Sequence, residues 1–174
     1  MCLNNWGGID HKVLEFHEYV NLFSGKSGSG KSTVMDAIQV ILYGSFSPSF
    51  LNKAADDAKN RRSVLSYLRG EQKDGSANRK DCDFCSVIAL EIEDTGTHII
   101  TCIGIAFEVR KSDSEIKKFV YFSHSGKMPE SEYLTEQGVC YSNQEIKKLV
   151  SARTKSDDNR GKGEVNRIYG SKEA

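Results

Sequence analysis

Hydrophobic and polar residues alternate with two different periods in the first quarter of the chain, and each period predicts one kind of element. Residues 1–24 read as two strands, one including residues 12–16 and the other residues 19–23. Apolar residues then recur at helical spacing, which predicts a helix over residues 31–43. The apolar stripe of this helix consists of Val34, Ala37, Ile38, Ile41 and Leu42. Gly44 follows where a C-terminal cap is expected.

The middle of the chain has the alternation of strands. Segments 84–93, 97–110 and 116–123 are rich in Ile, Val, Thr and Phe and are separated by short turns. This spacing predicts an antiparallel meander and not further strand–helix–strand units. In the first segment Ile88, Leu90 and Ile92 share one face, which predicts a half-exposed strand.

Two short helices are expected, over residues 62–68 and 145–152. Beyond residue 153 the chain is polar and aperiodic. We therefore expect one domain over residues 1–152 and a disordered tail, or a truncated continuation, over residues 153–174.

Composition and charge narrow the class of protein. The 174 residues carry no net charge and contain no run of the roughly 20 apolar residues that span a bilayer. The N-terminus lacks the pattern of a secretory signal, so a cytoplasmic protein is expected. Residues 52–80 hold eight basic and four acidic side chains, which is compatible either with binding of a polyanion or with a solvated loop.

The cysteines leave a second possibility open. Five cysteines without a signal peptide indicate reduced thiols. Cys82 and Cys85 form a C-x-x-C pair, which a zinc site could use only if Cys102, His98 or His124 joined it.

Candidate chemistry is concentrated between the second predicted strand and the helix. Residues 25–33 read Gly-Lys-Ser-Gly-Ser-Gly-Lys-Ser-Thr, a full match to the P-loop pattern G-x-x-x-x-G-K-[ST]. A strand before the motif and a helix after it are the context that this nucleotide site requires. The alternative is an ordinary glycine-rich turn.

The motif assigns roles by its chemistry. Backbone N–H groups of the loop and of the helix N-terminus would surround the phosphates of a nucleoside triphosphate. Lys31 would reach the β- and γ-phosphates, Ser32 would ligate Mg²⁺, and Thr33 would contact the α-phosphate. The predicted cofactors are ATP and Mg²⁺, with GTP not distinguished. The predicted binding residues are Gly25, Lys26, Ser27, Gly28, Ser29, Gly30, Lys31, Ser32 and Thr33, with Lys31 also catalytic.

A hydrolytic carboxylate is not evident. Glu93 or Asp94, after the apolar run 87–92, could serve as Walker B, but the alternation in that run is not that of a strand buried on both faces. The sequence also contains no Leu-Ser-Gly-Gly-type signature.

The chain resembles the N-terminal half of an SMC/Rad50-type ATPase head. The resemblance is carried by the P-loop, the helix after it that reads Val-Met-Asp-Ala-Ile, an arginine-bearing loop and the meander. Within that group the chain is similar to the SMC-like subunits of bacterial condensin-type systems, the MukB-like and Wadjet (JetC) proteins. The segments that carry this similarity are Asn5-Trp6, residues 50–55, residues 67–71 and residues 86–91.

The resemblance implies an α/β P-loop NTPase fold, the N-terminal lobe of an ABC-type head, with an antiparallel meander beside the P-loop strand and helix. It implies an ATPase whose hydrolysis needs a C-terminal half-head, a head dimer around ATP, kleisin-type subunits and a role on DNA at the nucleoid, in chromosome organisation or plasmid defence. Arg61, Arg62 or Arg69 would match the arginine that contacts nucleotide or DNA. Asn5 and Trp6 would lie near the nucleotide or in the core.

Two other functions stay open. The chain could be a stand-alone P-loop NTPase or kinase that uses Glu93 or Asp94, or an interaction module whose P-loop is only structural.

Overall fold

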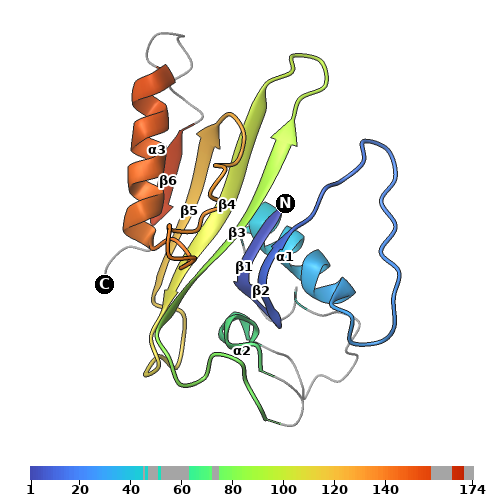
Figure 1. The fold of residues 1–174 in the computed structure, drawn as a ribbon, viewed down its shortest axis with the longest axis vertical. Helices are drawn as coiled ribbons and strands as arrows, with labels where there is room; N and C mark the ends of the chain where they lie inside the picture. Colours follow the sequence, from blue (N-terminus) through green and yellow to red (C-terminus); the bar gives the residue numbers. More distant parts are fainter. Residues whose placement is uncertain (45, 47–50, 52–62, 72–74, 158–165, 171–174) are drawn as a thin grey trace.

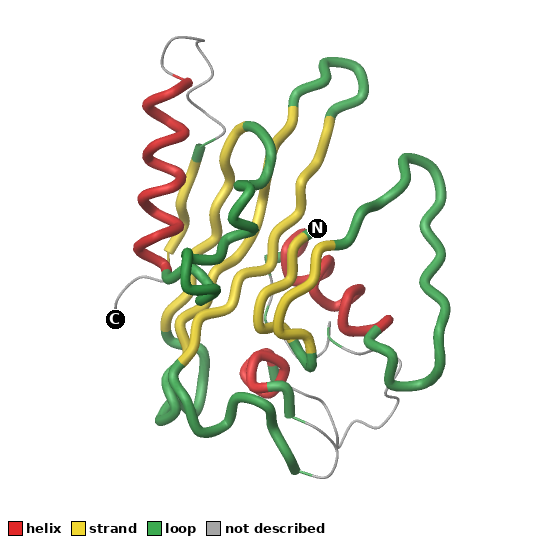
Figure 2. The backbone as a smooth tube through the Cα atoms, in the orientation of Figure 1, coloured by secondary structure: helices red, strands yellow, loops and turns green. Residues whose placement is uncertain are grey.

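The computed structural model describes residues 1–44, 46, 51, 63–71, 75–157 and 166–170. A six-stranded sheet runs through the middle of the molecule in the order β2-β1-β3-β4-β5-β6, and every neighbouring pair is antiparallel. Figures 1 and 2 show α1 and α3 on the two sides of this sheet. The elements are β1 (Cys2–Trp6), β2 (Ile9–Val13), α1 (Lys31–Tyr43), α2 (Val64–Arg69), β3 (Phe84–Glu93), β4 (Ile100–Val109), β5 (Lys118–Ser125), α3 (Asn143–Asp157) and β6 (Arg167–Gly170).

Both faces of the sheet are buried near its centre, because successive side chains of each strand point to opposite faces. Ile88 and Leu90 pack in the core beneath α1, whereas Val87 and Ala89 belong to a second core beneath α3. The predicted half-exposed strand is therefore wrong for most of β3, since residues 86–90 are all buried. Exposure begins only near its end, where Ile92 is 44% exposed.

The predicted P-loop helix is confirmed, and its buried face is slightly rotated. α1 buries Val34, Ala37, Val40 and Ile41 together with Asp36. Leu42, which the apolar stripe included, is exposed. Gly44 caps the helix as predicted, in the left-handed conformation, and its N–H bonds to the Val40 carbonyl.

α3 is longer than the predicted 145–152 at both ends, and a capping box fixes its start. The Ser142 hydroxyl accepts from the Glu145 N–H at 3.3 Å, and the Glu145 carboxylate accepts from the Ser142 N–H at 2.7 Å. Ile146 and Val150 then face the sheet.

The N-terminal strands differ from the prediction. β1 and β2 form a hairpin in residues 2–13, so a strand over 12–16 is wrong apart from its first two residues. The strand expected over residues 19–23 is also wrong: these residues are all described, and none is in a strand. They belong to a long loop over residues 14–24 that stands away from the sheet (Figure 2).

Residues 153–174 contain more regular structure than expected. α3 continues to Asp157, and β6 pairs with β5 through Tyr169 and Tyr121. β6 has only four residues, 167–170, and polar residues flank it. No local pattern therefore predicted this edge strand. The helix expected over residues 62–68 corresponds to α2. No helix in the described part of the chain is both long and apolar enough to cross a membrane.

Candidate functional site

The P-loop motif forms an exposed loop that leads into the N-terminus of α1. Residues 25–29 are exposed, and Lys31 begins the helix. Gly30 is the N-cap at φ 87° and ψ 7°, a left-handed conformation that favours glycine. No side chain caps the helix and no acidic residue lies in its first turn, so the positive end of the helix dipole meets solvent. The geometry therefore fits an anionic ligand.

The side chain of Lys31 lies across the loop. Its Nζ donates to the carbonyl of Gly25 at 2.7 Å, to the carbonyl of Lys26 at 2.9 Å and to Ser29 Oγ at 3.3 Å. These bonds hold the ammonium group at the mouth of the loop. Ser32 is exposed in the first helical turn, where its hydroxyl can reach a cation bound beside the phosphates.

The first turns of α1 are tied to two neighbouring elements. Trp6 Nε1 in β1 donates to the carbonyl of Thr33 at 2.9 Å. The Tyr67 hydroxyl in α2 donates to the carboxylate of Asp36. Trp6 is fully buried, so it lies in the core behind the loop and not against a nucleotide base. Asn5 is also structural here, since its side-chain amide donates to the Cys85 carbonyl at 2.8 Å.

The structure describes only one of the three arginines that were predicted to contact nucleotide or DNA. Arg61 and Arg62 lie outside the described residues. Arg69 ends α2, and its guanidinium donates to the carbonyl of Asp113 at 2.6 Å and to the carbonyl of Lys111 at 3.1 Å. These bonds tie α2 to the β4–β5 turn, an arrangement that favours an anchoring role for Arg69.

Glu93 and Asp94 are not brought to the P-loop. Both lie at the tip of the β3–β4 hairpin, which Figure 1 shows at the other end of the molecule from the start of α1. Hydrogen bonds from the N–H groups of Thr97 and Gly96 lower the pKa of the Asp94 carboxyl. Glu93 pairs with His98 at 3.0 Å. Both carboxylates thus stabilise the turn of this hairpin.

The cysteines are spread over the molecule. Cys82 is exposed, whereas burial raises the pKa of Cys85 to about 11 and the pKa of Cys102 to about 12. In the described residues no three His, Cys, Asp or Glu side chains are grouped as metal ligands.

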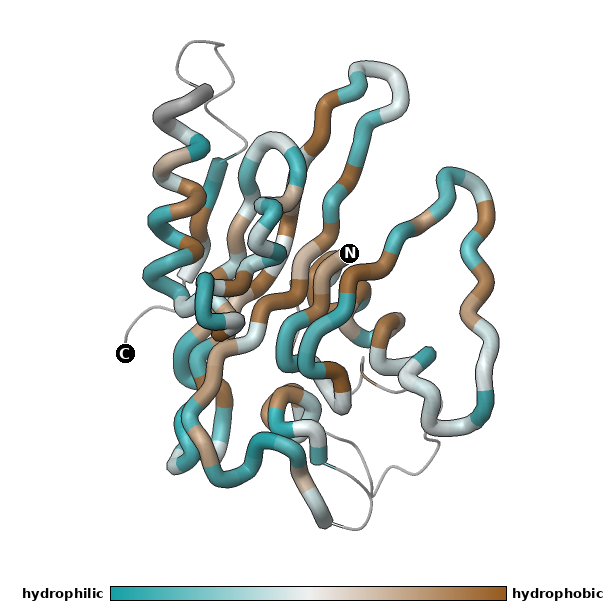
Figure 3. Tube along the Cα trace, in the orientation of Figure 1, coloured by the Kyte–Doolittle hydropathy of each residue, from teal (hydrophilic) through white to brown (hydrophobic). Residues whose placement is uncertain are grey.

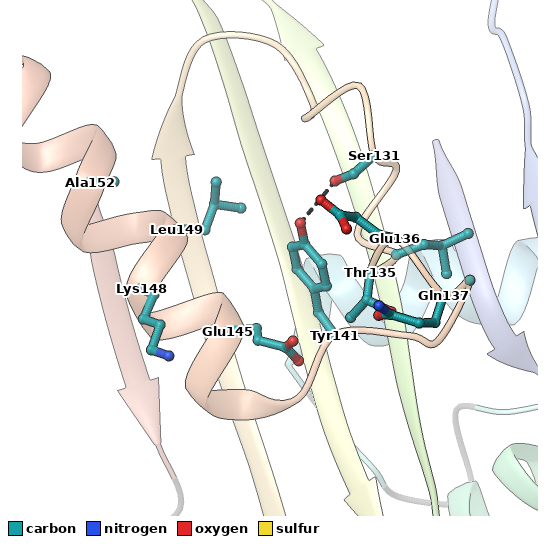
Figure 4. A pocket seen from close by; sticks show the side chains of 11 residues that line it. Ser131, Thr135, Glu136, Gln137, Tyr141, Glu145, Lys148, Leu149 and Ala152 are labelled. Carbon is teal, nitrogen blue, oxygen red and sulfur yellow. Dashed lines mark hydrogen bonds between the residues drawn. The ribbon is translucent and has the colours of Figure 1, made fainter.

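A hollow lies on the α3 side, between that helix and the loop over residues 126–142 (Figure 4). Tyr141 lies in its centre and bonds to Ser131 at 3.0 Å. Its wall combines the apolar side chains of Leu134, Leu149 and Ala152 with polar and charged ones such as Glu145 and Lys148. It belongs to the face of the sheet opposite α1, so it is separate from the P-loop.

Sequence reasoning identified the loop but missed the residues that hold it. Asp36 and Tyr67 are 31 positions apart, and no local pattern links them. The buried Arg79, which donates to the Gly7 carbonyl in the β1–β2 turn, was counted only as one charge of a basic segment.

Comparisons with known proteins agree with this geometry. Residues 1–58 match the family described as the P-loop containing region of AAA domain. The chain is also 33% identical over 72 residues to the SbcC component of the nuclease SbcCD from Staphylococcus haemolyticus, a match that covers 39% of this chain and 6% of that protein. No solved structure matches. The chain thus spans a small fraction of the relative's length. Together, the loop geometry and the two matches support an SMC/Rad50-type P-loop ATPase family for this chain.

Proposed function

We propose that this chain is the ATP-binding N-terminal half of a condensin-like SMC/Rad50-type ATPase head that acts on DNA. The observation that carries this proposal is the Lys31 ammonium group at the mouth of an exposed glycine loop, which leads into a helix N-terminus without acidic neighbours. Residues 25–33 would hold the triphosphate, and Ser32 would ligate Mg²⁺. When bound, Mg²⁺ would offset the phosphate charge.

A second half-head is proposed because the segment before the P-loop is left without a sheet. Tyr19, Val20 and Leu22 are 87%, 76% and 88% exposed. Asn21 closes the loop with two hydrogen bonds to the backbone of His17, and Phe16 packs edge-on against Phe23. Figure 3 shows the hydrophobic positions along this loop. Exposed apolar residues next to a nucleotide site mark a surface that another segment covers.

We also propose that hydrolysis needs a further segment. Glu93 and Asp94 are occupied at a hairpin tip away from the loop, so a further segment would supply the carboxylate that polarises water. Head dimerisation, kleisin-type subunits, and a role in chromosome organisation or plasmid defence are part of this proposal. The action on DNA is supported by the similarity to a protein whose name describes a nuclease subunit.

The test is Mg-ATP binding and turnover by the purified chain, with Lys31→Ala as the control. We expect binding without turnover, and about 100-fold weaker binding in Lys31→Ala, because hydrogen bonds to charged groups contribute about 1.5–3 kcal/mol. The free energy of unfolding of the variant should stay within about 0.5 kcal/mol, since the site is at the surface.

Other outcomes point to other functions. Turnover by the chain without a partner would favour the stand-alone NTPase and direct attention to Glu93 and Asp94. Equal binding by the Lys31→Ala variant, or no binding at all, would contradict the proposal and leave the interaction module. A competition with GTP would determine the preferred base.

A further inference from the structure

The start of α1 rests on a junction of three elements that the P-loop motif does not include. The β1–β2 turn, α1 and the C-terminus of α2 meet at Gly7. A Cβ atom at Gly7 would lie 2.7 Å from Thr33 Cγ2, and one at Gly70 would lie 2.7 Å from the Gly7 carbonyl. Both glycines have positive φ, at 58° and 65°. Only glycine, which has no Cβ atom, therefore lets the backbones of the three elements approach this closely. Figure 1 shows α2 next to the end of the β1–β2 hairpin and α1 beside the same hairpin.

Polar bonds fix this junction from both sides. The Arg79 guanidinium donates to the carbonyl of Gly7, to the carbonyl of Leu68 at 2.9 Å and to Asp10 at 2.6 Å. Burial lowers the pKa of Arg79. One buried cation thus binds the hairpin turn to α2.

The helix that carries the P-loop is bound to the same junction. Trp6 donates to the Thr33 carbonyl at 2.9 Å, and the Tyr67 ring stacks on the Trp6 ring with centroids 5.3 Å apart. The Tyr67 hydroxyl donates to Asp36, which is 4% exposed. Thr33 directly follows Lys31 and Ser32 in the chain, and Asp36 lies about one helical turn further on. The bonds to these two residues therefore set the direction in which the helix N-terminus points.

We propose that Tyr67, its partner Asp36 in α1, and Trp6 are positioning residues for the nucleotide. The inference rests on the proposed function. The pair holds the first two turns of α1 in the orientation at which Lys31 and Ser32 meet the phosphates. Preorganised groups bind more tightly because less order is lost on binding. All three side chains are buried, so they would act through α1 and not by touching the ligand.

The chain offers a matched control at the other end of the same helix. The Tyr121 hydroxyl donates to the carbonyl of Gly44 at 2.7 Å, so it anchors the C-terminus of α1. Tyr67→Phe and Tyr121→Phe each remove one hydroxyl that holds α1. The two variants differ in which end of α1 loses its hydrogen bond.

The experiment measures the Mg-ATP dissociation constant of both variants at a temperature where both are folded, together with their melting temperatures. We expect Tyr67→Phe to bind at least about fivefold more weakly, which corresponds to one lost hydrogen bond. Tyr121→Phe should lower the melting temperature with binding within about twofold of the unmodified chain. Lowered melting temperatures in both variants with unchanged binding would overturn the inference and show a purely structural role.

Asp36 allows a rescue test. Asp36→Ala should lose about as much affinity as Tyr67→Phe, and the double variant should lose little more than either single variant, because each variant breaks the same Tyr67–Asp36 bond. Asp36→Asn keeps an oxygen that accepts from Tyr67, so it should recover most of the affinity that Asp36→Ala loses. Additive losses in the double variant would contradict the proposed pair.

Trp6 is the one tryptophan of the chain. Its fluorescence therefore reports on the junction without any substitution there. Its emission should change when Mg-ATP binds, because its N–H is bonded to the P-loop helix, and in Lys31→Ala the same change should need a much higher Mg-ATP concentration. Binding that leaves this emission unchanged would overturn the inference alone. Failure of the unmodified chain to bind Mg-ATP would overturn the proposed function and the inference with it.

Discussion

The two faces of the sheet are covered in different ways. On one face, α3 and the loop over residues 126–142 close a core that includes the fully buried Tyr133 and Ile146. On the other face, α1 and α2 cover an equally apolar core, but exposed apolar residues continue beyond it. They are Phe16, Tyr19, Val20 and Leu22 in the 14–24 loop, and Met35, Leu42 and Tyr43 on α1.

This difference bears on the proposed second half-head. Among the described residues, the α3 face leaves Val139 exposed and a hollow beside Tyr141, but its core is otherwise packed within the chain and carries no recognisable motif. The P-loop face has the motif and a dense set of polar bonds, and its apolar surface is left open next to the nucleotide site. The α3 face therefore acts as a support, and the P-loop face is where a partner segment would bind.

The largest effect is expected from a core substitution on the α3 face. Ile146→Ala removes a side chain that is 0% exposed and packs against the sheet. We expect a loss of about 2–5 kcal/mol in the free energy of unfolding, from lost transfer energy and the cavity left behind. Urea denaturation measures it. A loss below about 1 kcal/mol would mean that the α3 face is not a closed core.

A smaller effect, also on the α3 face, depends on pH. His124 is fully buried and its Nε2 lies 3.1 Å from the Tyr133 hydroxyl. Burial lowers the pKa of His124 below its ordinary 6.5. The unfolded chain therefore binds this proton more readily than the folded chain does. The stability that a neutral His124 contributes is present above about pH 6.5 and is lost as the pH falls through the lowered folded pKa.

Urea denaturation at about pH 7.5 and at about pH 5.5, on either side of the ordinary histidine pKa, checks this dependence. His124→Gln, which keeps a polar group beside Tyr133 and does not titrate, should show a weaker loss at the lower pH. An equal loss in both proteins would assign the pH dependence to other groups.

The smallest effect on stability is expected in the 14–24 loop. Leu22→Ser should change the free energy of unfolding by no more than about 0.5 kcal/mol, because the side chain is 88% exposed. It should, however, weaken binding of the proposed second half-head when that segment is added, as measured by calorimetry. A large loss of stability in the isolated chain would show that Leu22 is already packed and would remove the contrast between the two faces.

Local patterns predicted the elements whose signal lies within a few residues. β3 was predicted with its observed bounds, 84–93, and α1 with its start, its end and its glycine cap, because periodicity and capping are local properties. The Ser142–Glu145 capping box was also readable from the sequence and would have placed the start of α3 correctly. The error at residues 19–23 has a different origin. An apolar run forms a strand only where another strand offers its backbone groups, and the described chain offers none there.

The sequence by itself determined the P-loop, because the glycines, the lysine and the serine that would meet the phosphates are adjacent in the chain. Only the tertiary structure decided how that loop is held. The bonds from Trp6 to Thr33 and from Tyr67 to Asp36 cross 27 and 31 positions and depend on the packing of three elements at Gly7. The tertiary structure also decided that β3 is buried on both faces, because α1 and α3 pack on opposite faces of the same sheet. Contacts between segments far apart in the chain leave no local pattern from which they can be predicted.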